Sequence, residues 1–108
     1  MDSGGSERRK AKRFTYVCEV ECGNSDRFSL NRLANLSAAG AWVEALNPSP
    51  EGSLVTLTFD IGMQQVRARA RVIRRVEGHG MGVLFEDLSP RYREAIEALT
   101  SFGRKIIR

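Results

Sequence analysis

The sequence lacks the features of a membrane, secreted or metal-dependent protein. No apolar run approaches the about 20 residues of a membrane-spanning helix, and the polar start from Met1 to Lys10 predicts no secretory signal. Only two cysteines are present, Cys18 and Cys22, and four residues of strand separate them by about 13 Å, beyond the roughly 7 Å limit for a disulfide. We therefore expect two buried thiols in a reducing cytoplasm, and His79, the single histidine, gives no basis for a metal site.

Groups with catalytic chemistry are equally scarce. His79 lies between two glycines, and no serine or cysteine has an obvious paired base. Glu86 and Asp87 are neighbours at the end of a predicted strand, so their side chains point to opposite faces and form no acid–base pair. No glycine-rich phosphate loop of the Walker or Rossmann type is present. The sequence predicts a protein that is not an enzyme and holds no metal and no cofactor.

Apolar and polar residues alternate at period two through most of the chain, which is typical of half-buried strands. The predicted strands cover residues 14–22, 28–33, 41–46, 55–61, 66–72 and 81–85. Ser89 as N-cap and Pro90 at the first helical position then predict a helix that reaches residue 102. Together these elements predict an all-β fold, a six-stranded antiparallel barrel with one C-terminal α-helix.

The charge is concentrated at one end of a chain that has the length of one domain. We expect a flexible segment over residues 1–7, a basic arm over 8–13, a barrel over 14–88, and a helix over 89–102 followed by a tail. The net charge is +4, and residues 1–13 hold five basic and two acidic residues, so three of the four net charges lie there. Most basic residues are arginines, whose planar fork binds phosphates and guanine edges with two hydrogen bonds. A small, localised anion is therefore favoured over a long polyanion, with a solvated basic tail as the alternative.

Two short constellations remain as candidate binding motifs. The first is the basic run from Arg8 to Arg13, and the second is Asn35-Leu36-Ser37-Ala38-Ala39-Gly40 between the second and third predicted strands. Asn35 and Ser37 project to the same side of an extended backbone, and Gly40 leaves room for another group to approach. The alternative is a polar connection in which Asn35 and Ser37 bond their own backbone.

The two constellations resemble the signature of the PilZ domain family, R-x-x-x-R followed by [D/N]-x-S-x-x-G. Arg9-Lys10-Ala11-Lys12-Arg13 matches the first part, Asn35 to Gly40 matches the second, and Gly82-Val83-Leu84-Phe85 resembles the closing strand of the family. The resemblance implies a bacterial receptor for the second messenger cyclic di-GMP, built on a six-stranded barrel with a C-terminal helix. It also implies a role in the regulation of motility or biofilm formation.

The resemblance assigns Arg9 and Arg13 to the phosphates and guanine edges of the ligand, with stacking of their guanidinium planes on the bases. Arg8 precedes the motif and extends this clamp, and an arginine at this place resembles family members that bind a stacked pair of ligands. Ligand binding is expected to close the arm over the barrel and to create an altered surface for a downstream protein.

On the barrel wall, the resemblance assigns Asn35 to guanine donors, Ser37 to a phosphate or the same base, and Gly40 to close approach of the backbone. Asn35 stands where many members have aspartate. Arg74 stands where many members place an aromatic residue that stacks on a base, and its alternation with Val72 directs it toward the barrel mouth. The alternative is a surface arginine. Trp42, the only tryptophan, is expected to pack under the C-terminal helix.

Two other functions stay open. One is a protein-interaction adaptor of the same fold that does not bind nucleotide. The other is a small RNA-binding barrel that uses the outward stripe of Arg67, Arg69 and Arg71. Aromatic residues do not interleave with this stripe as single-strand binding requires, so we expect no nucleic acid. We also expect no membrane insertion, because no apolar run is long enough to span a membrane.

Overall fold

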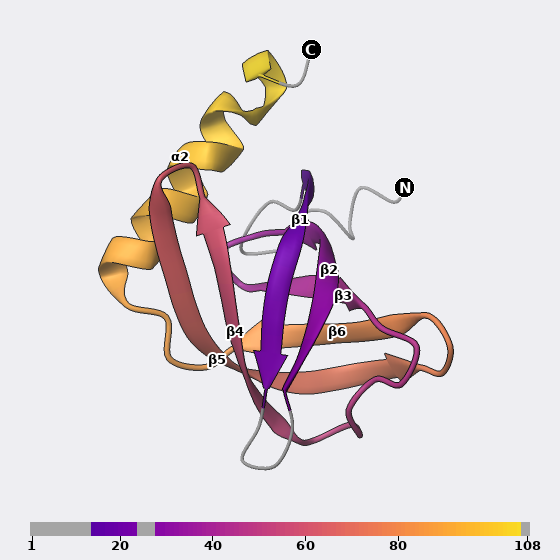
Figure 1. Cartoon of the computed structure of the whole chain (residues 1–108). Helices are drawn as coiled ribbons and strands as arrows, with labels where there is room; N and C mark the ends of the chain where they lie inside the picture. The colour runs from indigo at the N-terminus through magenta and orange to yellow at the C-terminus, as the bar shows by residue number, and fades with distance from the viewer. Residues whose placement is uncertain (1–13, 24–27, 107–108) are drawn as a thin grey trace, which may run out of the picture.

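The computed structural model describes residues 14–23 and 28–106 and is a closed barrel of six antiparallel strands with one helix beside it (Figure 1). The strands follow one another around the barrel in the order β1-β2-β3-β6-β5-β4. Their bounds are β1 Phe14–Gly23, β2 Phe28–Leu36, β3 Gly40–Glu44, β4 Leu54–Ile61, β5 Gln64–Val76 and β6 Gly80–Phe85, and the helix α2 covers Pro90–Ile106. The predicted fold class is confirmed.

The barrel interior is filled by the apolar residues that alternate along each strand. On β5, Val66, Ala68, Ala70 and Val72 are at most 3% exposed, whereas the arginine between each pair points outward. Small alanines suit this position because the interior of a small closed barrel is crowded. The period-two pattern therefore identified the inner face of this strand correctly.

Three β-bulges interrupt the alternation. They lie between Thr15 and Cys18 on β1, between Leu33 and Asn35 on β2, and between Val72 and Arg74 on β5. Because a bulge adds one residue to one strand, the side chains beyond it change faces. Arg74 is exposed for this reason, so the predicted lean toward the barrel mouth is wrong and the alternative of a surface arginine is correct.

The helix begins as predicted and runs further than predicted. The backbone N–H of Tyr92 donates to Ser89 Oγ at 3.4 Å, which is the N-cap interaction expected of Ser89. The helix ends at Ile106 rather than at residue 102. It packs against β4 and inserts the fully buried Ile96 into the barrel core, so it covers one part of the wall.

We predict that the two thiols react slowly in the folded protein. Both cysteines are free; Cys22 is buried as expected, whereas Cys18 is only half-buried. Desolvation raises the pKa of each thiol to about 11. At pH 8 only about one thiol in a thousand is then ionised, and the thiolate is the reactive form. A colorimetric disulfide reagent at pH 8 should label the native protein at least about tenfold more slowly than the protein in guanidinium chloride. Equal rates in the two solutions would contradict the burial of these thiols.

Candidate functional site

A row of outward-facing residues crosses five neighbouring strands of the barrel wall. The strand registers pair Thr15 with Asn35, Asn35 with Trp42, Trp42 with Gly82, and Gly82 with Arg74. We call these five residues the wall row. Thr15, Asn35 and Arg74 each border one of the three bulges, so the departures from regular pairing turn these side chains outward together.

Asn35 holds an unsatisfied polar atom at the centre of this row. Its Oδ1 is buried, and no described residue donates a hydrogen bond to it. A buried acceptor without a donor costs about 1–3 kcal/mol, so native proteins keep few of them. An acceptor in this state is chemically suited to a ligand that brings N–H donors.

Ser37 closes the turn after Asn35. Its Oγ accepts hydrogen bonds from the backbone N–H groups of Ala39 at 3.1 Å and Gly40 at 3.2 Å. The backbone N–H of Ser37 also donates to the carbonyl oxygen of Gly40 at 2.9 Å. Residues 35–40 are therefore the end of β2, a tight turn and the start of β3, rather than the long interruption that the sequence suggested. The alternative of a serine that bonds its own backbone describes Ser37 well.

Gly40 is required by the packing of the barrel. A Cβ at this position would overlap the backbone carbonyl oxygen of Val83 on β6. In this structure the missing side chain of Gly40 lets β6 pack closely against the first residue of β3.

Trp42 and Arg74 form a contact on the outer face of β3, β6 and β5. The guanidinium carbon of Arg74 lies 5.9 Å from the centroid of the Trp42 ring, which is cation–π geometry. The indole ring lies against Gly80 and Gly82 of β6, where the missing side chains leave space for it. The expectation that Trp42 packs under the helix is wrong, because β3 and β4 lie on opposite sides of the barrel. The two glycines that alternate on β6 were the sequence signal that could have identified this place.

The predicted arginines Arg8, Arg9 and Arg13 lie outside the described residues. Their connection to the wall row is nevertheless short, because Thr15 is the β1 residue paired with Asn35. Arg13 is two residues before Thr15, so the chain joins their Cα atoms over at most about 7 Å.

The arginine stripe on β5 is largely engaged in ion pairs. Arg69 bonds Asp87 at 2.7 Å, and the Arg71 guanidinium bonds both oxygens of Glu86 at 2.8 and 3.1 Å. The Arg71 guanidinium lowers the pKa of the Glu86 carboxyl below its ordinary value. Glu86 and Asp87 thus connect the outer face of β5 to the segment between β6 and α2.

Metal ligands and membrane segments are absent from the same part of the chain. Among the described residues, no three His, Cys, Asp or Glu side chains are grouped so that they could hold a metal ion. No helix there is long and apolar enough to span a membrane.

Comparison with known proteins agrees with the barrel geometry. A model of the PilZ domain family matches residues 7–102. The structure of the Bacillus subtilis inhibitor of motility, MotI/DgrA, has a TM-score of 0.81 at 18% identity over 94% of this chain, which spans about half (53%) of that protein. The PilZ domain of Escherichia coli YcgR, solved with c-di-GMP, has a TM-score of 0.70 at 19% identity, with 92% of this chain and 94% of that chain covered. The search of curated proteins found no match.

We predict that Gly40→Ala strongly destabilises the protein, whereas Gly82→Ala is tolerated. The first Cβ would overlap a backbone carbonyl oxygen, but a Cβ at Gly82 would meet the Trp42 ring at an ordinary 3.5 Å. We expect a loss of about 3 kcal/mol for Gly40→Ala and less than about 1 kcal/mol for Gly82→Ala, measured by urea denaturation. Equal losses for the two variants would show that the approach of β6 does not require the glycine.

Proposed function

Because the chain belongs to the PilZ domain family, we propose that it is a cyclic di-GMP receptor that binds its ligand on the wall row. The observation that carries the proposal is the buried Oδ1 of Asn35 without a donor among the described residues. Solved structures of the same fold that contain c-di-GMP, including the PilZ domain of YcgR, support this choice of ligand.

The guanine base carries N–H donors that can bond to the Oδ1 of Asn35, which has no donor among the described residues. Its Watson–Crick edge carries N1–H and N2–H groups side by side, and an amide oxygen accepts from them. In water-excluded surroundings such bonds contribute more than they do at an exposed surface, because the acceptor has no competing partner. Ser37 and Gly40 contribute by fixing the turn that carries Asn35.

The arginines before β1 supply the positive charge that the two phosphates require. In this proposal Arg9 and Arg13 bind phosphates and the O6 and N7 edges of guanine through their planar forks. Arg8 extends the clamp. The chain reaches the wall row at Thr15, so these side chains need no rearrangement of the barrel to meet a ligand held by Asn35.

Besides the guanidinium groups of Arg9 and Arg13, the guanidinium plane of Arg74 is a further flat surface for the ligand. It is exposed and lies over the Trp42 ring, so its guanidinium plane can stack on a base at the end of the row opposite to the arm. A ligand that is bound by Arg74 at one end and by Arg9 and Arg13 at the other brings the basic arm, residues 8–13, onto the wall row. The resulting change in the outer surface is the signal that a partner protein reads.

We predict that Arg9→Ala, Arg13→Ala and Asn35→Ala each weaken cyclic di-GMP binding at least about tenfold, or about 1.4 kcal/mol, in titration calorimetry. The thermal midpoint of the ligand-free protein should not fall, since Asn35→Ala removes a buried atom that has no partner among the described residues. Arg91→Ala and Asn47→Ala, at exposed positions on α2 and in the β3–β4 connection, are the matched controls that keep full affinity. Wild-type protein that gives no heat with tens of micromolar cyclic di-GMP would favour an adaptor that does not bind nucleotide.

We also predict that Asn35→Asp keeps or tightens cyclic di-GMP binding, up to about tenfold, because a carboxylate forms charge-assisted bonds with both guanine donors. The ligand-free variant should melt at a lower temperature than the wild type, since an unpaired charge is then buried. Asn47→Asp makes the same charge change in an exposed connection and should alter neither property. A large loss of affinity in Asn35→Asp would refute the assigned guanine edge.

A further inference from the structure

The barrel wall has an incomplete stretch between β2 and the end of β3. On one side, β2 pairs with β1 as far as Phe28. On the other side it pairs with β3 only from Arg32 onward, because β3 ends at Glu44. Among the described residues, none forms a strand pair with Phe28–Asn31 on the side away from β1. In an antiparallel strand, alternate residues direct their N–H and C=O groups to this side, so part of the β2 edge is open.

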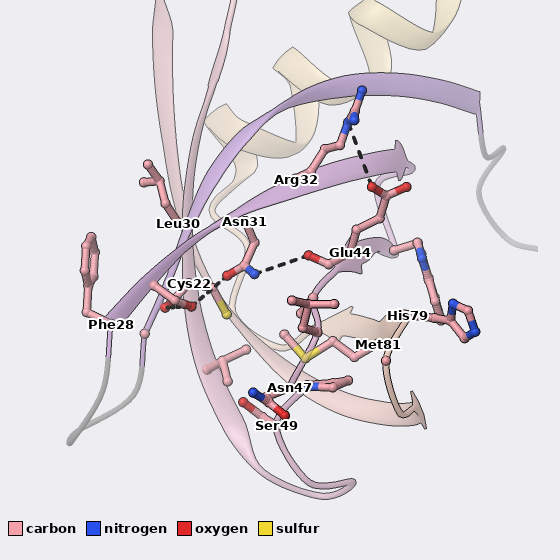
Figure 2. A pocket seen from close by; sticks show the side chains of 18 residues that line it. Cys22, Phe28, Leu30, Asn31, Arg32, Glu44, Asn47, Ser49, His79 and Met81 are labelled. Carbon is pink, nitrogen blue, oxygen red and sulfur yellow. Dashed lines mark hydrogen bonds and ion pairs between the residues drawn. The ribbon is translucent and has the colours of Figure 1, made fainter.

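A hollow of about 1220 Å³ occupies the place where β3 would continue. The chain after Glu44 turns away from β2, because Ala45 donates to His79 O at 3.1 Å and Gly78 donates to Leu46 O at 3.1 Å. Figure 2 shows Asn31 directed across the gap toward Glu44, and its Nδ2 donates to the backbone oxygen of that residue at 3.2 Å. The hollow exceeds the about 300–1,000 Å³ of typical small-molecule sites.

The outer side of this open edge is apolar. Phe28 is 67% exposed and Leu30 is 55% exposed, and both lie on the outer face of β2 (Figure 2). Native proteins normally protect a free strand edge with charged side chains, prolines or a covering segment. An open edge bordered by two large exposed apolar side chains is therefore suited to pairing with another strand.

The charge around the edge indicates the chemistry of that strand. Glu21 faces Leu30 across β1 and β2, Glu19 faces Arg32, and Glu44 borders the hollow. Among the described residues around the edge, these three exposed carboxylates stand against one guanidinium, and the Arg32–Glu44 ion pair is long at 3.9 Å. The described part of this region is thus acidic in a chain whose net charge is +4. Strands lie about 4.8 Å apart, so a lysine or arginine on an added strand can reach Glu44 directly and Glu21 across β2.

From these observations we infer that the open edge of β2, Phe28–Asn31, docks an extended segment of a partner protein. The segment adds to the sheet in the place where β3 would continue, turns apolar side chains toward Phe28 and Leu30, and carries basic residues at its ends. Small polar side chains on its other face enter the hollow beside Ser29 and Asn31, which are joined by a 2.7 Å hydrogen bond. This site goes beyond the proposed nucleotide receptor, and it is separate from the buried oxygen of Asn35.

The test uses the full chain, labelled with nitrogen-15, and the capped peptide Lys-Ser-Val-Ser-Val-Ser-Lys, whose lysines and valines share one face in a strand. We expect amide shift changes at residues 28–31 and 44–46, and slower hydrogen exchange of the β2 amides that point away from β1. The same peptide with glutamate in place of lysine should bind at least about tenfold more weakly, since it places like charges beside Glu44 and Glu21.

Matched variants connect these changes to the edge. Leu30→Thr and Glu44→Gln should each weaken peptide binding at least about fivefold, while Val17→Thr on β1 and Glu94→Gln on α2 change an exposed residue elsewhere and should have no effect. Asn35→Ala should bind the peptide normally even where it no longer binds cyclic di-GMP, so failure of one proposal is distinguishable from failure of the other.

Three outcomes would overturn the inference. The first is the absence of shifts at millimolar peptide, and the second is binding that Glu94→Gln weakens as much as Glu44→Gln, which would indicate nonspecific charge attraction. The third is a set of concentration-dependent shifts at residues 28–31 without any peptide, which would assign the edge to a second copy of this chain.

Discussion

The contact between the backbone of Gly40 and the carbonyl oxygen of Val83 is the constraint on which the candidate site depends. It brings β3 so close to β6 that no side chain fits at the first residue of β3. The turn before Gly40 must then be tight, and the Ser37 hydroxyl holds it by accepting two backbone N–H groups. The close approach of β3 to β6 and the hydrogen bonds of the Ser37 hydroxyl together fix the position of Asn35 beside this turn. Two residues that the sequence suggested as ligand contacts are thus first of all residues that build the platform for Asn35.

Asn35 itself is a local conflict within an otherwise consistent fold. The barrel core consists of apolar residues that alternate along the strands. At the outer wall, however, the buried amide oxygen of Asn35 has no hydrogen-bond donor among the described residues. Consistent sequences satisfy their buried polar groups, and exceptions concentrate where function requires them. A ligand with two adjacent N–H donors satisfies this oxygen. The free energy that the ligand-free protein loses by burying an unpaired acceptor is then regained on binding, which favours the complex.

Periodicity was sufficient to predict the six strands, the inner faces of β4, β6 and β5 as far as Val72, and the start of the helix. The motif residues Asn35, Ser37 and Gly40 were also identified from the sequence, although their roles in the turn depend on contacts of the folded chain that no local pattern shows. Bulges could not be predicted, because an added residue leaves the local composition unchanged while it reverses the face of every later residue in the strand. Arg74 was therefore assigned to the wrong face. The partnership of Trp42 with Arg74 was missed for a related reason, since it depends on the register of three strands rather than on any one of them.

The short length of β3 connects the two proposed surfaces. This strand has five residues: Gly40 fixes one end against β6, and Glu44 ends the other at the hollow. Trp42 lies between them and belongs to both surfaces, because it pairs with Asn35 in the wall row and also lines the hollow. In the proposed receptor, a ligand stacked on Arg74 would lie close to the Trp42 ring, whose centroid is 5.9 Å from the guanidinium carbon. Because the same ring also lines the hollow, the two proposals together would put a nucleotide and a partner segment within reach of one side chain.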